Sequence, residues 1–133
     1  MIRYLTKEQI LFIHAKGIEE HGGSMGLLNE GVVDSAVHAP QGSFSGVEFY
    51  PTPSEKAAVL GFTLVMGHAF VDGNKRVGFA AMKTFLLLNG RKLTCTPDDG
   101  EATILRLCNR EIGKHEFAQW VDDHCDQRQL PGE

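Results

Sequence analysis

Residues 54–90 read SEKAAVLGFTLVMGHAFVDGNKRVGFAAMKTFLLLNG, and this stretch decides the fold. Ser54 is a good N-cap, so we expect a helix from residue 55 to residue 67 or 68. That helix is apolar around nearly its whole circumference, which is typical of a buried helix. A second helix is predicted over residues 74–89, because Gly90 is a typical C-terminal stop. Two buried helices in succession indicate a mostly α architecture.

The flanking sequence adds more helices and one irregular segment. Thr6 to Gln9 has the spacing of a capping box, and helical periodicity continues over residues 7–21. Shorter apolar patterns bounded by proline or glycine predict further helices over residues 30–39, 98–110 and 114–125. Residues 91–95 suggest a strand, and residues 41–53 suggest an extended flap or irregular hairpin. We expect a bundle of about six helices with a short β-like flap, in a single domain over residues 1–133.

The composition excludes several classes of protein. With 42% hydrophobic and 23% charged residues, the chain is globular rather than disordered or fibrous. Its net charge of -4 gives no overall positive field, so we expect no direct binding to nucleic acid or to an anionic membrane. The three cysteines are widely spaced, which fits neither a disulfide scaffold nor a zinc ribbon and favours a reducing cytoplasm.

The loop between the two central helices, HAFVDGNKR at residues 68–76, carries the chemistry. Gly73 and the residues after it begin a helix, where backbone N–H groups lack internal partners and the helix dipole favours an anion. Lys75 and Arg76 add charge-assisted donors that suit phosphate. The loop therefore predicts a binding site for a polyphosphate.

Two other side chains of this loop suit phosphate chemistry. A carboxylate beside phosphates, here Asp72, typically holds Mg2+. Histidine is the residue type that most often serves as a general base near neutral pH, and His68 stands at the preceding helix end. Phe70 is expected to anchor the loop in the core. The alternative interpretation is a structural histidine followed by a solvated Lys-Arg pair.

The HAFVDGNKR segment resembles the Fic/Doc signature, H-x-F-x-[DE]-G-N-[GK]-R, and specifically its Doc (death-on-curing) branch. Weaker similarity extends over about residues 4–125. The resemblance implies that His68 deprotonates a target Thr or Ser hydroxyl and that Asp72 holds Mg2+. It also implies a set of residues that hold the phosphates of ATP, namely Gly73, Asn74, Lys75 and Arg76.

Within the family, the resemblance favours phosphoryl transfer. Members that transfer AMP usually have Gly at the position of Lys75 and a second Arg at the position of Phe79. Both departures point to a Doc-type toxin kinase, with Lys75 among its catalytic residues, that uses ATP and Mg2+ to phosphorylate elongation factor Tu and inhibit protein synthesis. Two alternatives stay open. One is a Fic-type AMP transferase, and the other is a non-catalytic binding or co-regulator module, because Met66 stands where the phage Doc type has an Arg.

The resemblance also implies partners. No inhibitory [ST]-x-x-x-E-[GN] helix occurs in this chain, so inhibition would come in trans from a Phd-like antitoxin whose tail folds on binding. Residues 43–50 would correspond to the family's flap, which aligns the target by strand pairing. The remaining histidines lack metal-ligand spacing and are assigned to surface or capping positions: His14, His21, His38, His115 and His124.

Overall fold

The computed structural model describes residues 1–127, and this part of the chain is mostly helical. It contains six α-helices, one 3-10 turn and two small antiparallel strand pairs. The elements are α1 (Lys7–His21), α2 (Glu30–His38), η1 (Ala39–Gln41), β1 (Ser43–Phe44), β2 (Val47–Glu48), α3 (Pro53–Gly67), α4 (Asn74–Leu88), β3 (Arg91–Leu93), α5 (Pro97–Cys108), α6 (Lys114–Asp123) and β4 (Cys125–Gln127). The predicted mostly α bundle with a short β-like hairpin is confirmed.

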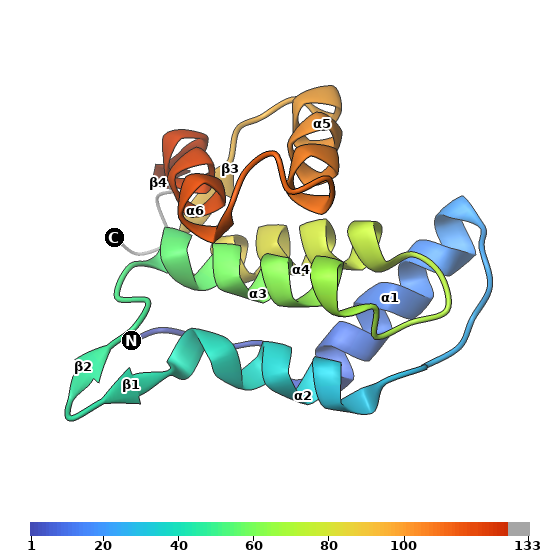
Figure 1. Cartoon of the computed structure of the whole chain (residues 1–133), viewed down its shortest axis with the longest axis horizontal. Coiled ribbons are helices and arrows are strands. Elements are labelled where there is room, and N and C mark those ends of the chain that lie inside the picture. Colours follow the sequence, from blue (N-terminus) through green and yellow to red (C-terminus); the bar gives the residue numbers. More distant parts are fainter. Residues whose placement is uncertain (128–133) are drawn as a thin grey trace.

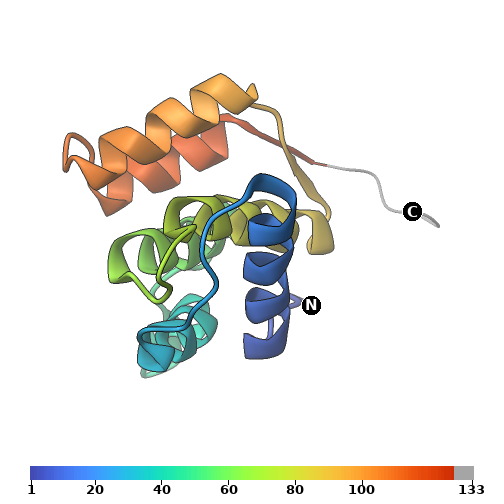
Figure 2. The same cartoon turned by 90° about the vertical axis from the view of Figure 1, so that its right-hand side faces the viewer.

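The helices are arranged in three layers, with α3 and α4 in the middle (Figure 1). The pair α5 and α6 covers one side of this middle layer, and α1 and α2 cover the other (Figure 2). Small residues let α3 and α4 approach closely: a Cβ added at Gly78 would lie 2.4 Å from Val65 Cγ2 and 3.0 Å from the Gly61 carbonyl oxygen. The buried helix pair predicted from residues 54–90 is therefore the core of the molecule.

Several predicted helix boundaries differ from the structure by one or two residues. The N-cap of α3 is Thr52, whose side chain accepts from the Glu55 N–H at 3.1 Å, while Ser54 is buried and donates to Asp122 Oδ1 at 3.0 Å. Helix α2 ends at His38, as Pro40 indicates, and the 3-10 turn η1 follows it. Helix α6 ends at Asp123, since the next residues leave the helix and Cys125 pairs with Leu93 to join β4 to β3.

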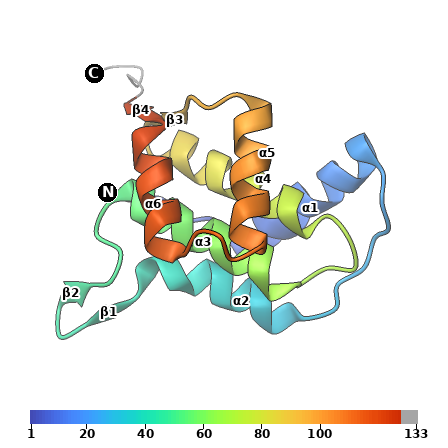
Figure 3. The same cartoon turned by 45° about the horizontal axis from the view of Figure 1, so that its top comes forward.

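The hairpin β1–β2 lies at one end of α3, and the loop between α3 and α4 lies at the other (Figures 1 and 3). Helix α3 has 15 residues, so the two ends are about 22 Å apart. The prediction of a hairpin is correct, but its distance from the loop between α3 and α4 argues against the target-aligning flap role expected for residues 43–50. The segment that contacts the loop between α3 and α4 is instead residues 22–29.

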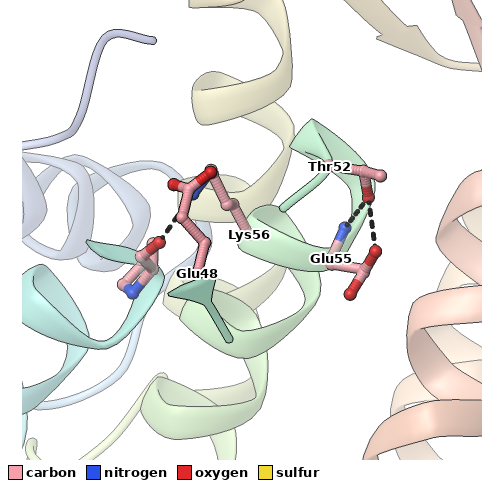
Figure 4. A network of polar contacts seen from close by, with 5 residues as sticks. Glu48, Thr52, Glu55 and Lys56 are labelled. Carbon is pink, nitrogen blue, oxygen red and sulfur yellow. Dashed lines mark hydrogen bonds and ion pairs between the residues drawn. The ribbon is translucent and has the colours of Figure 1, made fainter. Parts of the chain in front are cut away.

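A buried lysine ties this hairpin to α3 (Figure 4). Lys56 is only 1% exposed, and its Nζ donates to Glu48 Oε1 at 2.8 Å and to the Pro40 carbonyl oxygen at 3.0 Å. Its Nζ also lies 5.7 Å from the centre of the Tyr4 ring. Burial lowers the pKa of Lys56, but its contacts with Glu48 and Tyr4 outweigh burial and raise the pKa above its ordinary value of 10.5.

We expect Lys56→Ala to lower the free energy of unfolding by about 2–4 kcal/mol, because it leaves the Pro40 carbonyl without a donor and opens a cavity. The raised pKa of Lys56 stabilises the folded state fully when the pH is below the pKa of this lysine in the unfolded chain. This stabilisation is lost as the pH rises through the pKa of Lys56 in the folded protein. Urea unfolding at about pH 8 and about pH 11 should therefore show a smaller difference between the two proteins at the higher pH. Lys83→Ala, at an exposed position of α4, serves as the control. If Lys56→Ala were as stable as this control, the lysine would not anchor the hairpin.

No helix in residues 1–127 combines the length and the apolar character that crossing a membrane requires.

Candidate functional site

The motif loop, defined as residues 68–73, turns the chain between the two central helices. His68 ends α3 in the left-handed conformation, with φ 53° and ψ 55°, and Gly73 begins α4 as N-cap with φ 78°. A left-handed residue other than glycine costs about 1–2 kcal/mol, and such strain concentrates at functional sites. The structure therefore holds His68 at the loop entrance in spite of a local cost.

The exposed His68 side chain is oriented by the end of its own helix. Its Nδ1 lies 3.2 Å from the Met66 carbonyl oxygen. Because a carbonyl oxygen only accepts, Nδ1 donates, and in the neutral ring Nε2 is the atom left to take a proton. This is the arrangement that a general base needs.

The motif loop is closed by Asn74 and anchored by Phe70. The Asn74 Oδ1 accepts from the Phe70 N–H at 3.0 Å, and its Nδ2 donates to the Phe70 carbonyl oxygen at 2.9 Å. Phe70 is 3% exposed, so its predicted role as an anchor is confirmed. Since the Asn74 side chain is engaged in closing the loop, its backbone N–H in the first turn of α4 is the group that it offers to an anion.

Asp72 carries the carboxylate of the site. Its Oδ1 accepts from the Gly73 N–H at 2.9 Å and its Oδ2 from the Ser24 N–H at 3.3 Å. Each oxygen keeps a further lone pair, so the carboxylate can still bind a cation. Within residues 1–127 there is no cluster of three or more His, Cys, Asp or Glu side chains that could hold a metal. A single carboxylate fits Mg2+, which takes one or two protein ligands and completes its shell with water and phosphate oxygens.

Lys75 and Arg76 lie in the first turn of α4, and both are exposed. Neither forms an ion pair with a carboxylate in the described part of the chain. The Arg76 side chain extends over α1, where a Cβ added at Gly17 would lie 3.3 Å from its Cδ. Two cations without acidic partners at a helix N-terminus oppose the dipole, and a bound anion would offset that cost.

The segment of residues 22–29, which we name the α1–α2 loop, borders the motif loop. The Leu28 N–H donates to the Ala69 carbonyl oxygen at 2.7 Å, and the Val71 N–H donates to that of Gly26 at 3.0 Å. Leu27 and Phe70 form an isolated antiparallel bridge. In sequence the first residues of this segment were expected to end the first helix, and its three glycines, Gly22, Gly23 and Gly26, were a signal of an unusual backbone; all three have positive φ.

Comparison with known proteins shows the family of this chain. Residues 4–86 match the family model described as Fic/DOC family. The chain belongs to the Fic/Doc family. It is 41% identical over 98 residues to Toxin Doc of Mycolicibacterium smegmatis, an alignment that covers 74% of this chain and 73% of that protein. It is 25% identical over 103 residues to Protein kinase doc of Escherichia phage P1, covering 77% of this chain and 81% of that protein.

The Fic/Doc match contains the complete motif loop and both segments that pack against it, α1 and the α1–α2 loop. Two residues in this region contribute to the site without a signal in the sequence for that role. Gly23 lies against Asp72, and His14, which was assigned to the surface or to a cap, is buried beneath the motif loop. The resemblance to the Doc branch that the HAFVDGNKR segment suggested is confirmed by the 41% identical relative.

Two of the cysteines of this Fic/Doc chain are weakened as nucleophiles by burial. All three are free thiols. Burial raises the pKa of Cys95, with a further contribution from Asp99, and burial likewise raises the pKa of Cys125. Since the thiolate is the reactive form, neither is an activated nucleophile at neutral pH.

Gly23 gives a direct test of how closely the α1–α2 loop must approach Asp72. A Cβ at Gly23 would lie 2.8 Å from Asp72 Oδ2, whereas a Cβ at Gly22 would meet nothing within 4 Å. Both glycines have positive φ, so alanine at either position costs about 1–2 kcal/mol in backbone strain. We expect Gly23→Ala to weaken binding of Mn2+ in the presence of ATP, measured by titration, by about 10-fold or more relative to Gly22→Ala. Equal binding by the two variants would show that the carboxylate tolerates displacement.

Proposed function

We propose that this Fic/Doc protein is a Doc-type toxin that transfers the γ-phosphoryl group of ATP to a Thr or Ser hydroxyl of a translation factor, with elongation factor Tu as the target. One observation carries the proposal. The motif loop and the first turn of α4 bring together an oriented histidine, a carboxylate and two cations without acidic partners. Two relatives of this chain are named Toxin Doc and Protein kinase doc, which supports both the toxin role and the kinase reaction.

The residues of the loop divide the reaction among them. His68 Nε2 takes the proton of the target hydroxyl while the hydroxyl oxygen bonds to the γ-phosphorus. The bond between the γ-phosphorus and the β,γ-bridging oxygen breaks, and ADP leaves. Lys75, Arg76 and the first N–H groups of α4 hold the phosphates and stabilise their charge. Mg2+, bound through Asp72, would neutralise further phosphate charge. Phosphoryl transfer mainly needs such positioning, and the geometry of this loop suits it.

The position of Phe79 supports phosphoryl transfer over AMP transfer. AMP-transferring members of the family usually have a second Arg there. In this chain the Phe79 ring packs against α5, so closely that a Cβ added at Gly100 would lie 2.8 Å from its Cζ. Position 79 thus makes an apolar contact with α5 and offers no cation. The cations available to phosphate in the first turn of α4 are Lys75 and Arg76.

The proposal includes partners and a compartment. We infer that the α1–α2 loop takes over the target-aligning role first attributed to residues 43–50, because its backbone borders the motif loop and Met25 and Leu28 are exposed on it. A Phd-like antitoxin with a tail that folds on binding would supply inhibition in trans. The site of action would be the cytoplasm, where elongation factor Tu works.

Cell-free translation tests the target. The purified chain, supplied with ATP and Mg2+, should stop protein synthesis. An excess of untreated elongation factor Tu should restore synthesis when it is added afterwards together with antitoxin, which keeps the chain from modifying the added factor. Protein synthesis that continues undisturbed would contradict the toxin role. Restoration only by a different translation factor would contradict the assignment of elongation factor Tu.

A further inference from the structure

His14 lies directly beneath the motif loop. This α1 residue is 3% exposed and is one of four buried polar or charged side chains within residues 1–127. Its Nε2 lies 2.7 Å from the carbonyl oxygen of Asp72. Because a carbonyl oxygen only accepts, Nε2 carries the hydrogen and donates it. The bond joins α1 to the loop across 58 positions of sequence.

The same ring makes two further contacts with the loop. It stacks on Phe70, with ring centroids 3.7 Å apart and planes inclined by 8°. It also lies against Gly73, where an added Cβ would be 3.5 Å from Nε2. One imidazole therefore touches the anchor of the loop, the residue with the carboxylate, and the N-cap of α4.

The planarity of the peptide bond gives the bond to Asp72 its consequence. The carbonyl of Asp72 and the N–H of Gly73 belong to one rigid plane. When His14 holds the oxygen, the direction of the N–H is also fixed, and this N–H donates to Asp72 Oδ1 at 2.9 Å. A side chain on α1 thereby sets the orientation of a carboxylate that it does not touch.

The His14 ring borders two open pockets. His14 lines a cavity of about 190 Å³ between α1 and α4, together with Gly17 and Arg76. It also lines a second cavity, of about 350 Å³, with Leu11 and Met25. The contacts that join the ring to the loop are the hydrogen bond to Asp72, the stack on Phe70 and the contact with Gly73.

The geometry points to His14 as a positioning residue for phosphoryl transfer: through the peptide between Asp72 and Gly73 it fixes both the carboxylate and the first N–H groups of α4. This inference rests on the proposed function for its catalytic consequence. Its structural content, an immobilised motif loop, applies to the free protein as well. Side chains that orient the ligands of a metal typically change metal affinity or activity by about 10- to 100-fold when they are replaced.

Two substitutions separate the donor from the ring. His14→Phe retains a stacked ring without the donor, and His14→Gln retains a donor without the ring. His115→Phe, at an exposed position of α6, is the control. The measurements are amide hydrogen exchange over residues 72–76 of the free protein, Mn2+ affinity in the presence of ATP, and kcat and KM for the protein target.

We expect His14→Phe to accelerate exchange over residues 72–76, to weaken Mn2+ binding by about 10- to 100-fold and to lower kcat with little change in KM for the protein target. His14→Gln should change each quantity less.

Unaltered hydrogen exchange and Mn2+ affinity in His14→Phe would overturn the inference. A lower melting temperature of His14→Phe with neither of these changes would also overturn it. If His14→Phe does not fold, His14→Gln decides: retained slow exchange and Mn2+ binding support the inference, and loss of either overturns it. Absence of Mn2+ and ATP binding in the unsubstituted protein would refute the proposed function, whereas the exchange rates would still decide the role of His14.

Discussion

Replacing His68 with asparagine should lower transfer to the target by about 100- to 10,000-fold and abolish growth arrest. Asparagine tolerates the left-handed conformation that this position has, so the loop keeps its backbone while it loses the base. His68→Ala should have the same effect on transfer, with an additional cost from backbone strain. The measurement is the initial rate of modification of the purified target, together with growth after induced expression.

The control for His68 is another exposed histidine, His115, whose replacement by alanine should leave both the rate and the growth arrest unchanged. Thermal unfolding of all variants shows whether the fold is intact. Transfer or growth arrest that persists in His68→Asn would exclude this side chain as the base.

Replacing Asp72 with asparagine should reduce Mg2+-dependent transfer by about 100-fold or more, because a metal ion contributes several kcal/mol of charge stabilisation. The amide nitrogen of asparagine cannot accept a hydrogen bond, so the substitution also removes one of the two N–H contacts that hold this side chain, from Gly73 or from Ser24. Isothermal titration with Mg2+ and ATP measures the lost binding, and steady-state kinetics measure the lost rate.

Asp98→Asn is the matched control for Asp72, because Asp98 is an exposed carboxylate in the first turn of α5. It should leave metal and nucleotide binding unchanged. Mg2+-dependent ATP binding of full strength in Asp72→Asn would show that the ion, if one is needed, is held elsewhere.

Helices with strong local signals were predictable from sequence. Helix α1 begins and ends where the capping box at Thr6 and the glycine at position 22 indicate. For α3 a local signal was misread: Pro53 favours the first helical position and so makes Thr52, rather than Ser54, the N-cap. The strand β4 carries no such signal, because Cys125 pairs with a residue 32 positions earlier, Leu93.

The residues of the candidate site could be predicted from the sequence, but most of the contacts between them could not. The HAFVDGNKR pattern identified the residues, but only coordinates show that the Asn74 side chain closes the loop. The roles of His14 and Gly23 depend on contacts with Asp72 across 58 and 49 positions of sequence. An isolated buried histidine in an amphipathic helix has the same sequence pattern as a surface one. The hairpin of residues 43–48 could be predicted, and so could its distance from the site, because the hairpin precedes α3 and the motif loop follows this 15-residue helix.

The most direct test of the proposed kinase reaction is the transfer of label from ATP. Elongation factor Tu would be incubated with the chain, Mg2+ and either γ-labelled or α-labelled ATP, with His68→Asn in parallel. The account predicts label on the factor from the γ position alone, and none in the variant. Label from the α position would instead make the protein an AMP transferase, and the absence of His68-dependent label from either position would contradict an ATP-dependent transferase and favour the non-catalytic module.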